Sequence, residues 1–273
     1  DLEALTISEV GSNIAASYYE ARSNTLYVLI ENKIYILDPT KDEMREYIQL
    51  DIEKNIRNFV VDATNNKIIY TTDDFDLYIL DTNSGETKHI SSDVEAFKYS
   101  HINGALAYIS DGKIFVYHQD RSVKIESFED IDDFDVYGNK VFILTEKHVY
   151  IFDVEKSTTE DKLCVETGGF YSFYETKRFI LVGSRKGYVL IFDKKDITNV
   201  KYIYVGDKPI LSIYLDKKHN VLYLGGLKKR DKYNIAMVIR VDLKSLEKHT
   251  VEIRTDLERG IISEMFKLGD KLY

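Results

Sequence analysis

The sequence lacks most of the features that assign a chemistry or a compartment directly. Its 273 residues contain one cysteine, Cys164, so no disulfide forms within the chain, which fits a reducing compartment. No apolar run approaches the roughly 20 residues that a membrane-spanning helix needs. Residues 1–6 lack the basic and apolar regions of a secretory signal, although a signal already removed would leave the same sequence. We therefore expect a cytoplasmic protein without a membrane span.

Positively charged residues are also fewer than negatively charged ones. The 37 lysine and arginine residues stand against 46 aspartate and glutamate residues, which gives a formal net charge of −9 at pH 7. Proteins that bind the phosphate backbone of nucleic acids are normally basic. No nucleic acid partner is expected for this chain.

Motifs of catalytic and metal sites are missing as well. None of the six histidines pairs with another at i,i+2 or i,i+4, so the sequence offers no zinc spacing. No EF-hand loop, G-x-S-x-G turn, dinucleotide-binding motif or P-loop occurs. Gly183-Ser184 and Gly225-Gly226 are assigned to hairpins, where glycine serves the turn. The sequence thus predicts no catalytic residue, no metal, no cofactor and no enzymatic activity.

What the sequence does contain is an internal repeat. Its clearest marker is a short apolar run that ends in Asp, or once in His. The copies are Ile34–Asp38, Leu77–Asp81, Ile114–His118, Val149–Asp153, Val189–Asp193 and Val238–Asp242. Their last residues lie on average about 41 positions apart, which matches the period of about 40–45 residues of four-stranded propeller blades.

Three further strands are expected around each marker. A second apolar run precedes it, and an alternating run such as Phe170–Tyr174 opens the unit, with a small or polar residue between two large apolar ones. The small side chain suits an innermost strand in a crowded centre. A more polar segment follows the marker, as expected for an outer edge that faces water.

We therefore predict an all-β fold, a seven-bladed β-propeller of four-stranded blades, as a single domain over residues 1–273. Six units are expected at about 14–50, 56–91, 94–128, 131–167, 169–206 and 209–254. The seventh blade would combine C-terminal strands from residues 260–273 with an N-terminal strand from residues 4–10, which removes free edges. One strand of that blade is unaccounted for, so either the chain has been cut short or a partner's peptide or strand completes it.

The segment Phe170–Asp193 carries a family resemblance. It is similar to the inner strand, second strand, G-S-x-x-G turn and Asp-terminated third strand of the WD40-type β-propeller family. The resemblance extends over nearly the whole chain but is degenerate. Because Trp is absent, no copy has the family's W-D dipeptide, and the Gly-His pair is also missing. Propeller families with YVTN-like repeats remain an alternative.

A rigid propeller that presents many loops suits docking of peptides and domains, and its function then depends on the site it carries. We expect a non-catalytic protein–protein interaction scaffold, a subunit of a larger assembly. The alternative is an extracytoplasmic propeller that binds or processes a ligand in its central channel, with or without a divalent ion.

The candidate docking residues are charged residues in loops on one face of the predicted propeller. The acidic candidates, which would meet a basic tail, are Asp73, Asp74, Asp76, Asp130, Asp132 and Asp133. The basic candidates, which would meet an acidic peptide or a phosphate, are Lys228, Lys229, Arg230 and Lys232 in a long hairpin connection, residues 227–234. Such charges steer partners and set their orientation more than they add affinity.

Overall fold

The computed structural model describes residues 14–20, 25–38, 43–50, 52–125, 131–164, 169–176, 178–194, 196–230, 233–253, 267–268 and 271–272. Contacts divide the chain into two compact units, one made of Asp1–Ser127 with Val136–Asn139, the other of Phe128–Asp135 with Lys140–Tyr273. All regular elements in the described ranges are β-strands. None of these residues forms a helix with the length and apolar character that crossing a membrane requires.

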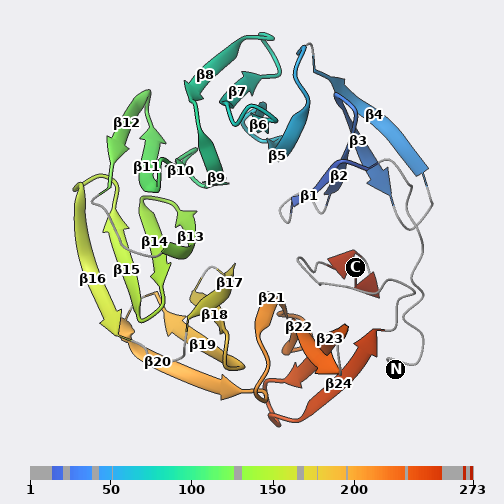
Figure 1. The fold of residues 1–273 in the computed structure, drawn as a ribbon, viewed down its shortest axis with the longest axis vertical. Coiled ribbons are helices and arrows are strands. Elements are labelled where there is room, and N and C mark those ends of the chain that lie inside the picture. Colours follow the sequence, from blue (N-terminus) through green and yellow to red (C-terminus); the bar gives the residue numbers. More distant parts are fainter. Residues whose placement is uncertain are drawn as a thin grey trace. The chain divides into compact units, whose positions relative to one another are not determined.

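The first unit holds three sheets, each of four strands paired in chain order (Figure 1). Blade 1 comprises β1 (Ala16–Glu20), β2 (Thr25–Ile30), β3 (Lys33–Asp38) and β4 (Glu43–Gln49). Blade 2 comprises β5 (Ile56–Asp62), β6 (Lys67–Thr72), β7 (Leu77–Asp81) and β8 (Thr87–Ser91). Blade 3 comprises β9 (Val94–Tyr99), β10 (Leu106–Ser110), β11 (Lys113–His118) and β12 (Arg121–Lys124).

The second unit holds three sheets of the same kind. Blade 4 comprises β13 (Ile131–Tyr137), whose last two residues group with the first unit, β14 (Lys140–Thr145), β15 (His148–Asp153) and β16 (Thr158–Cys164). Blade 5 comprises β17 (Phe170–Glu175), β18 (Phe179–Ser184), β19 (Tyr188–Asp193) and β20 (Asp196–Tyr204). Blade 6 comprises β21 (Ile210–Asp216), β22 (Val221–Arg230), β23 (Tyr233–Asp242) and β24 (Lys248–Ile253).

The prediction of an all-β fold with four-stranded blades is confirmed, but the predicted number of seven blades is wrong. Within the described residues the chain forms a β-propeller of six four-stranded blades. After blade 6, β25 (Lys267–Leu268) pairs with β26 (Lys271–Leu272), and within the described residues this two-stranded sheet has no further strand. Of the C-terminal segment predicted to supply strands, residues 260–273, only residues 267–268 and 271–272 lie within the described part of the chain. The predicted N-terminal strand, residues 4–10, lies outside the described residues.

Two dipeptides that were predicted at hairpin turns, Gly183-Ser184 and Gly225-Gly226, lie in strands instead. Gly183 is in β18, and Gly225-Gly226 is in β22. At Gly183 the requirement is space, because a Cβ there would lie 2.2 Å from Ser172 Oγ and 2.6 Å from Ile210 Cγ2. The left-handed turn residue of the β18–β19 hairpin is Gly187, with φ of 75°.

Asp81 and Asp242, which end the third strands of blades 2 and 6, close turns. Asp81 Oδ1 accepts hydrogen bonds from the backbone N–H groups of Asn83 and Ser84 at 2.9 and 3.0 Å. Asp242 binds the second and third N–H groups after it in the same way, at 2.8 and 3.0 Å. These backbone hydrogen bonds lower the pKa of both carboxyls. At these two positions the repeated Asp is thus an Asx-turn residue between the third and fourth strands.

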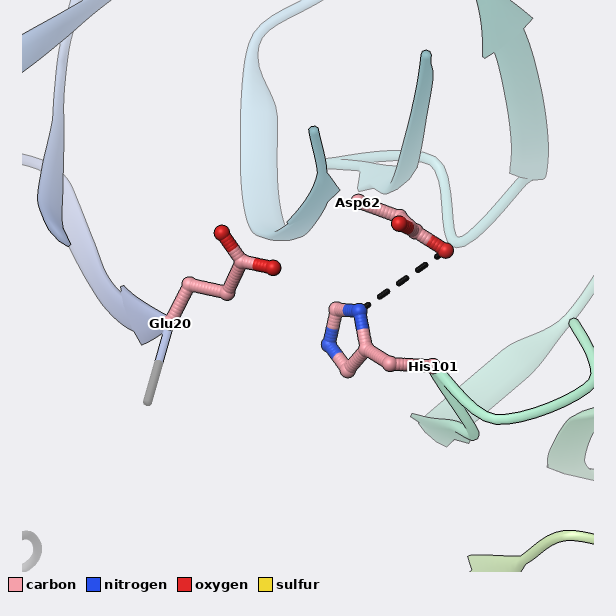
Figure 2. Close-up of side chains that lie close together, drawn as sticks. All are labelled: Glu20, Asp62 and His101. Atoms are coloured by element: carbon pink, nitrogen blue, oxygen red, sulfur yellow. Dashed lines mark ion pairs between the residues drawn. The ribbon is translucent and has the colours of Figure 1, made fainter. Parts of the chain in front are cut away.

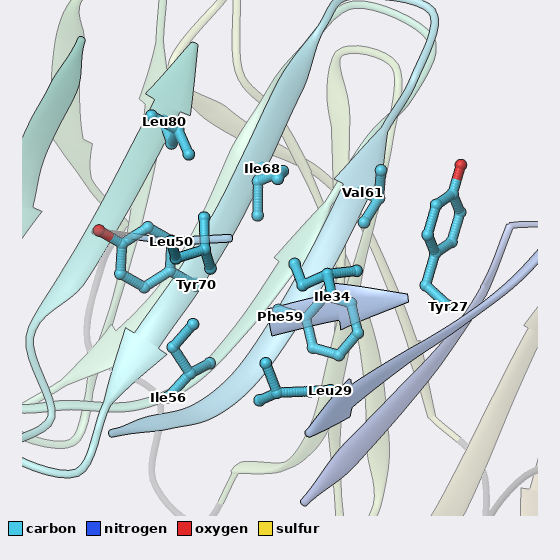
Figure 3. Close-up of a cluster of buried hydrophobic side chains, with 10 residues drawn as sticks. All are labelled: Tyr27, Leu29, Ile34, Leu50, Ile56, Phe59, Val61, Ile68, Tyr70 and Leu80. Carbon is cyan, nitrogen blue, oxygen red and sulfur yellow. The ribbon is translucent and has the colours of Figure 1, made fainter. Parts of the chain in front are cut away.

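Apolar side chains from facing sheets fill the space between neighbouring blades. The buried cluster between blades 1 and 2 consists of Tyr27, Leu29, Ile34, Leu50, Ile56, Phe59, Val61, Ile68, Tyr70 and Leu80 (Figure 3). Similar clusters join blade 2 to blade 3 and blade 5 to blade 6. The small residue predicted in a crowded first strand is buried at Ser172 and Ser212, but Asn58 and Ala96 are exposed. Packing between blades sets the first strands side by side, with β1 against β5 and β17 against β21.

The β22–β23 hairpin is longer than its neighbours. The prediction of a long loop at residues 227–234 is wrong, because the strands stay paired until Arg230 meets Tyr233. Within the described residues the flanking strands stop earlier: β21 pairs with β22 only as far as Gly226, and β24 pairs with β23 only from Ala236 onward. The hairpin therefore extends as a two-stranded ribbon beyond the four-stranded part of blade 6. Residues 228–232 read Lys-Lys-Arg-Asp-Lys and show no apolar alternation, so the sequence pattern indicated a loop there.

Candidate functional site

Three ionisable side chains meet where the first strands of blades 1, 2 and 3 end. Glu20 is the last residue of β1, Asp62 is the last residue of β5, and His101 follows β9. Figure 2 shows the three side chains pointing toward one another from three separate segments. One possible ligand atom from each lies within 4.8 Å of the others. Glu20 is 1% exposed and Asp62 is 0% exposed, so both carboxyl groups are removed from water.

Asp62 is held firmly. Its Oδ1 accepts the backbone N–H of Asn65 at 3.1 Å, and its Oδ2 accepts the Asn65 side-chain amide at 2.7 Å. The hydroxyl of Tyr99 donates to Oδ2 as well, at 2.9 Å, and ties blade 3 to blade 2. Burial alone raises the pKa of Asp62, but these hydrogen bonds and the nearby imidazole outweigh it and lower the pKa. The group is therefore a carboxylate at neutral pH.

His101 faces a carboxylate on one side and a phenol on the other. Its Nδ1 lies 3.8 Å from Asp62 Oδ2, and its side chain is 17% exposed. Its Nε2 lies 2.5 Å from the hydroxyl oxygen of Tyr18 on β1. The imidazole also stacks on the Tyr18 ring at 6.1 Å and meets the Tyr99 ring edge-on at 5.2 Å, measured between ring centres. These contacts leave the imidazole little freedom to turn.

Sequence reasoning missed this group for a clear reason. Zinc-binding sequence patterns place ligands a few residues apart, whereas positions 20, 62 and 101 are separated by about one repeat at each step. Aligning the repeat units at the end of each first strand would have placed Glu20, Asp62 and His101 in nearly equivalent positions. That was the available signal.

The acidic candidates of blade 2 already bind a cation of this chain. Asp73, Asp74 and Asp76 lie between β6 and β7. Lys54 Nζ lies 2.9 Å from an Asp74 oxygen and 2.8 Å from an Asp76 oxygen. Hydrogen bonds from Lys54 and from Ser92, the latter at 2.8 Å, lower the pKa of Asp76 to about 2. Asp74 and Asp76 are thus brought together around one ammonium group.

The acidic candidates of blade 4 are also engaged. Asp132 and Asp133 are on β13, and Asp130 lies outside the described residues. Asp132 Oδ1 lies 2.9 Å from a guanidinium nitrogen of Arg185, and its Oδ2 accepts the Phe170 N–H at 3.4 Å. Asp133 Oδ1 accepts the backbone N–H of the next residue at 2.9 Å.

The basic candidates lie on the extended hairpin. Lys228, Lys229 and Arg230 are the last three residues of β22, and Lys232 lies outside the described residues. They therefore occupy the part of the ribbon that projects beyond β21 and β24.

Comparison with known proteins gives a likeness of fold. No protein-family model matches the sequence, and no curated protein matches it either. A chain in the solved structure of a mitotic checkpoint complex aligns with 89% of this chain and 77% of its own length, with a TM-score of 0.62 and 10% identity. The shared feature is the β-propeller fold. At 10% sequence identity, the match shows a likeness of fold and nothing about function.

A second solved structure, that of the tricorn protease, aligns with 88% of this chain at 14% identity and a TM-score of 0.47. The chain spans only about a quarter of that protein, since the match covers 25% of its length.

Proposed function

We propose that the protein is a non-catalytic interaction module that binds an acidic segment of a partner protein through the tip of the β22–β23 hairpin. The observation that carries the proposal is the pairing of this hairpin beyond both flanking strands. A paired ribbon presents its side chains with less conformational freedom than a loop, so less entropy is lost on binding.

The positive charge of the hairpin tip favours binding of an acidic partner. Residues 228–232 read Lys-Lys-Arg-Asp-Lys, a local positive cluster in a chain whose formal net charge is −9. Charge complementarity of this kind steers association and sets the orientation of the partner. The acidic candidates support the proposal less, because Asp74, Asp76 and Asp132 already form ion pairs with Lys54 and Arg185.

The test compares partner capture by the wild-type chain and by the variant Lys228→Glu/Lys229→Glu/Arg230→Glu. A tagged chain is incubated with lysate of the source cells, and bound proteins are quantified by mass spectrometry. We expect a stoichiometric partner that is recovered at least about tenfold less by the variant, because attraction becomes repulsion across the contact.

A matched control reverses three charges at the other end of blade 6. Lys217→Glu/Lys218→Glu/Lys244→Glu changes exposed residues of the β21–β22 and β23–β24 turns. This variant should recover the partner as well as the wild type does. Equal losses in both variants would contradict docking at the hairpin, and the absence of any partner would contradict the interaction module itself.

A ligand-binding propeller is the second candidate, and one observation favours it. Glu20, Asp62 and His101 bring two buried carboxyl groups and an imidazole together. No equivalent support exists for a partner strand that completes a seventh blade, because the chain forms six four-stranded blades.

A further inference from the structure

We propose that Glu20, Asp62 and His101 form a binding site for one divalent transition-metal ion, with Zn²⁺ as the fitting ion. The inference is independent of the proposed docking function, because it concerns the ends of β1 and β5 and the residue group after β9 in the first unit. It also departs from the expectation of no metal, which came from local sequence spacing alone.

The distances between the three side chains are close to those of a metal site. Three donors from three blades lie within 4.8 Å of one another. Zinc bonds of about 2.0–2.1 Å in a tetrahedral site place ligand atoms about 3.3 Å apart, so the donors need to close by at most about 1.5 Å. Among the residues that the structure describes, no other set of three His, Cys, Asp or Glu side chains comes this close together.

The ligand atoms of the three side chains indicate which type of ion would bind. Two carboxylates and one imidazole provide two oxygen ligands and one nitrogen ligand. Ca²⁺ and Mg²⁺ prefer oxygen ligands alone, whereas an imidazole nitrogen suits Zn²⁺ and its neighbours in the transition series. A three-residue ligand set leaves a fourth position of a tetrahedral ion for water or for a bound molecule.

Neighbouring side chains orient two of the three ligands by hydrogen bonds. The Nε2–Tyr18 contact of 2.5 Å allows two tautomers of His101. When Nε2 carries the hydrogen and donates it to the phenol oxygen, the lone pair of Nδ1 faces Asp62. Zn²⁺ selects this tautomer, and Tyr18 then holds the ring, as a second hydrogen bond typically does for a metal-binding histidine. Asn65 and Tyr99 orient the Asp62 carboxylate in the same manner.

The competing interpretation is a network of hydrogen bonds that only joins the blades. Blade 6 provides a comparison, because Asp216 Oδ2 and His219 Nδ1 lie 2.7 Å apart in the equivalent turn. That pair has an Asp and a His but no third donor in the described part of the chain. The two groups therefore predict different responses to the metal: only the group with three donors should bind it tightly.

The test measures binding of Zn²⁺ alone to the full chain, by competition with a chromogenic chelator, after treatment with a stronger chelator. We expect one tight site per chain in the wild type. Glu20→Gln keeps the shape and removes one ligand charge, and His101→Gln removes the nitrogen ligand, so each should weaken binding by at least about tenfold. Tyr18→Phe, which removes only the supporting oxygen, should weaken it by about tenfold.

Matched controls come from other histidines near carboxylates. His219→Gln and His89→Gln remove imidazoles that lie 2.7 Å from Asp216 and 3.5 Å from Asp76. Both should bind Zn²⁺ as the wild type does. A wild type without a tight site, or binding lost in the controls but kept in Glu20→Gln, would overturn the proposal.

Folding of the variants is checked without relying on binding. The thermal midpoint is measured with chelator and then with Zn²⁺. The ion should raise the midpoint of the wild type and of the controls more than that of Glu20→Gln, because stabilisation by a ligand falls as its affinity for the folded state falls. An equal rise in Glu20→Gln would show that the ion binds elsewhere and would also overturn the proposal.

Discussion

At the scale of single residues, Gly183 shows how closely two blades approach each other. Ser172 of blade 5 donates a buried hydrogen bond of 2.8 Å to the backbone oxygen of Ile210 in blade 6. Gly183 lies directly beside this contact. Because Ser172 is 5% exposed and already bonded, its hydroxyl cannot move away to admit a methyl group.

We predict that Gly183→Ala lowers the free energy of unfolding by about 3 kcal/mol, the upper end for an overpacked core. The backbone at Gly183 is outside the left-handed region, so the loss is steric. Gly85→Ala is the control: no atom lies within 4 Å of its Cβ, but φ is 74°, so it should cost about 1 kcal/mol. Denaturant titration measures both, and a smaller loss for Gly183→Ala than for Gly85→Ala would contradict the close approach.

A second residue, Lys194, has an unusual ionisation. Burial, helped by the charge of Lys217 and opposed by Asp135, lowers the pKa of Lys194 to about 8. The unfolded chain has a lysine pKa of about 10.4. Between about pH 8 and 10.4 the unfolded state therefore binds more protons, and stability rises with pH across that window. Below it, the charged ammonium destabilises the folded state by a constant amount.

Lys194→Met should thus be more stable than the wild type at pH 7, by about 1–2 kcal/mol after allowance for solvent screening. The difference should shrink as the pH rises from 8 to 9.5, since the wild-type lysine becomes neutral. Lys244→Met, at an exposed turn position, is the control, with a difference from the wild type that stays constant. Urea titrations at pH 7, 8 and 9.5 measure the trend, and a gap that grows with pH would contradict it.

At the scale of elements, the turn after a first strand recurs with the same chemistry. Asp62 and Asp216 end β5 and β21, and each binds the third residue after it through both the backbone N–H and the side chain. The fourth residues, Asn66 and Asn220, both have left-handed φ values, 54° and 56°. Asp62 also receives the buried hydroxyl of Tyr99 from the next blade.

Asp62→Ala should therefore cost more than Asp216→Ala. We expect a loss of about 2–4 kcal/mol for Asp62→Ala, because a buried hydroxyl loses its acceptor along with two turn hydrogen bonds. Asp216→Ala should lose about 1 kcal/mol, because its turn partner His219 is half exposed. Both are measured by denaturant titration with a metal chelator present. Equal losses would show that the contact to Tyr99 adds nothing to the turn.

The elements were the most predictable part of the structure. Strands such as Phe170–Glu175 and Tyr188–Asp193 alternate apolar and polar residues or form short apolar runs, and the chain has strands there. The extension of the β22–β23 hairpin was not predictable, because residues 228–232 show no alternation of apolar and polar residues. The Glu20–Asp62–His101 group was missed because its members belong to three repeats, and only the packing of β1 against β5 and of blade 2 against blade 3 brings them together.

At the scale of the whole molecule, the sequence repeat predicts the β-propeller architecture but not the number of blades. Six units of about 41 residues correspond to the six four-stranded blades. The seventh was inferred from closure, which requires partner strands that a local pattern does not specify. The single domain over residues 1–273 stays a prediction.

The net charge is the other property of the whole molecule. A chain with a formal charge of −9 repels an acidic peptide, whereas the hairpin tip with Lys228, Lys229 and Arg230 attracts it. The two effects act over different ranges. The Debye length falls from about 30 Å at 0.01 M salt to about 10 Å at 0.1 M and about 3 Å at 1 M.

We therefore predict that a fluorescent six-glutamate peptide associates fastest at an intermediate salt concentration. From about 0.01 to 0.1 M the long-range repulsion is screened and the rate constant rises, and toward about 1 M the attraction of the tip is screened too and the rate constant falls. Stopped-flow anisotropy measures this. Lys228→Glu/Lys229→Glu/Arg230→Glu should show only the rise, since only repulsion is left to screen. A rate constant that falls steadily from the lowest salt concentration would mean that the peptide does not experience the net charge, and a maximum kept by the variant would place the attraction away from the hairpin.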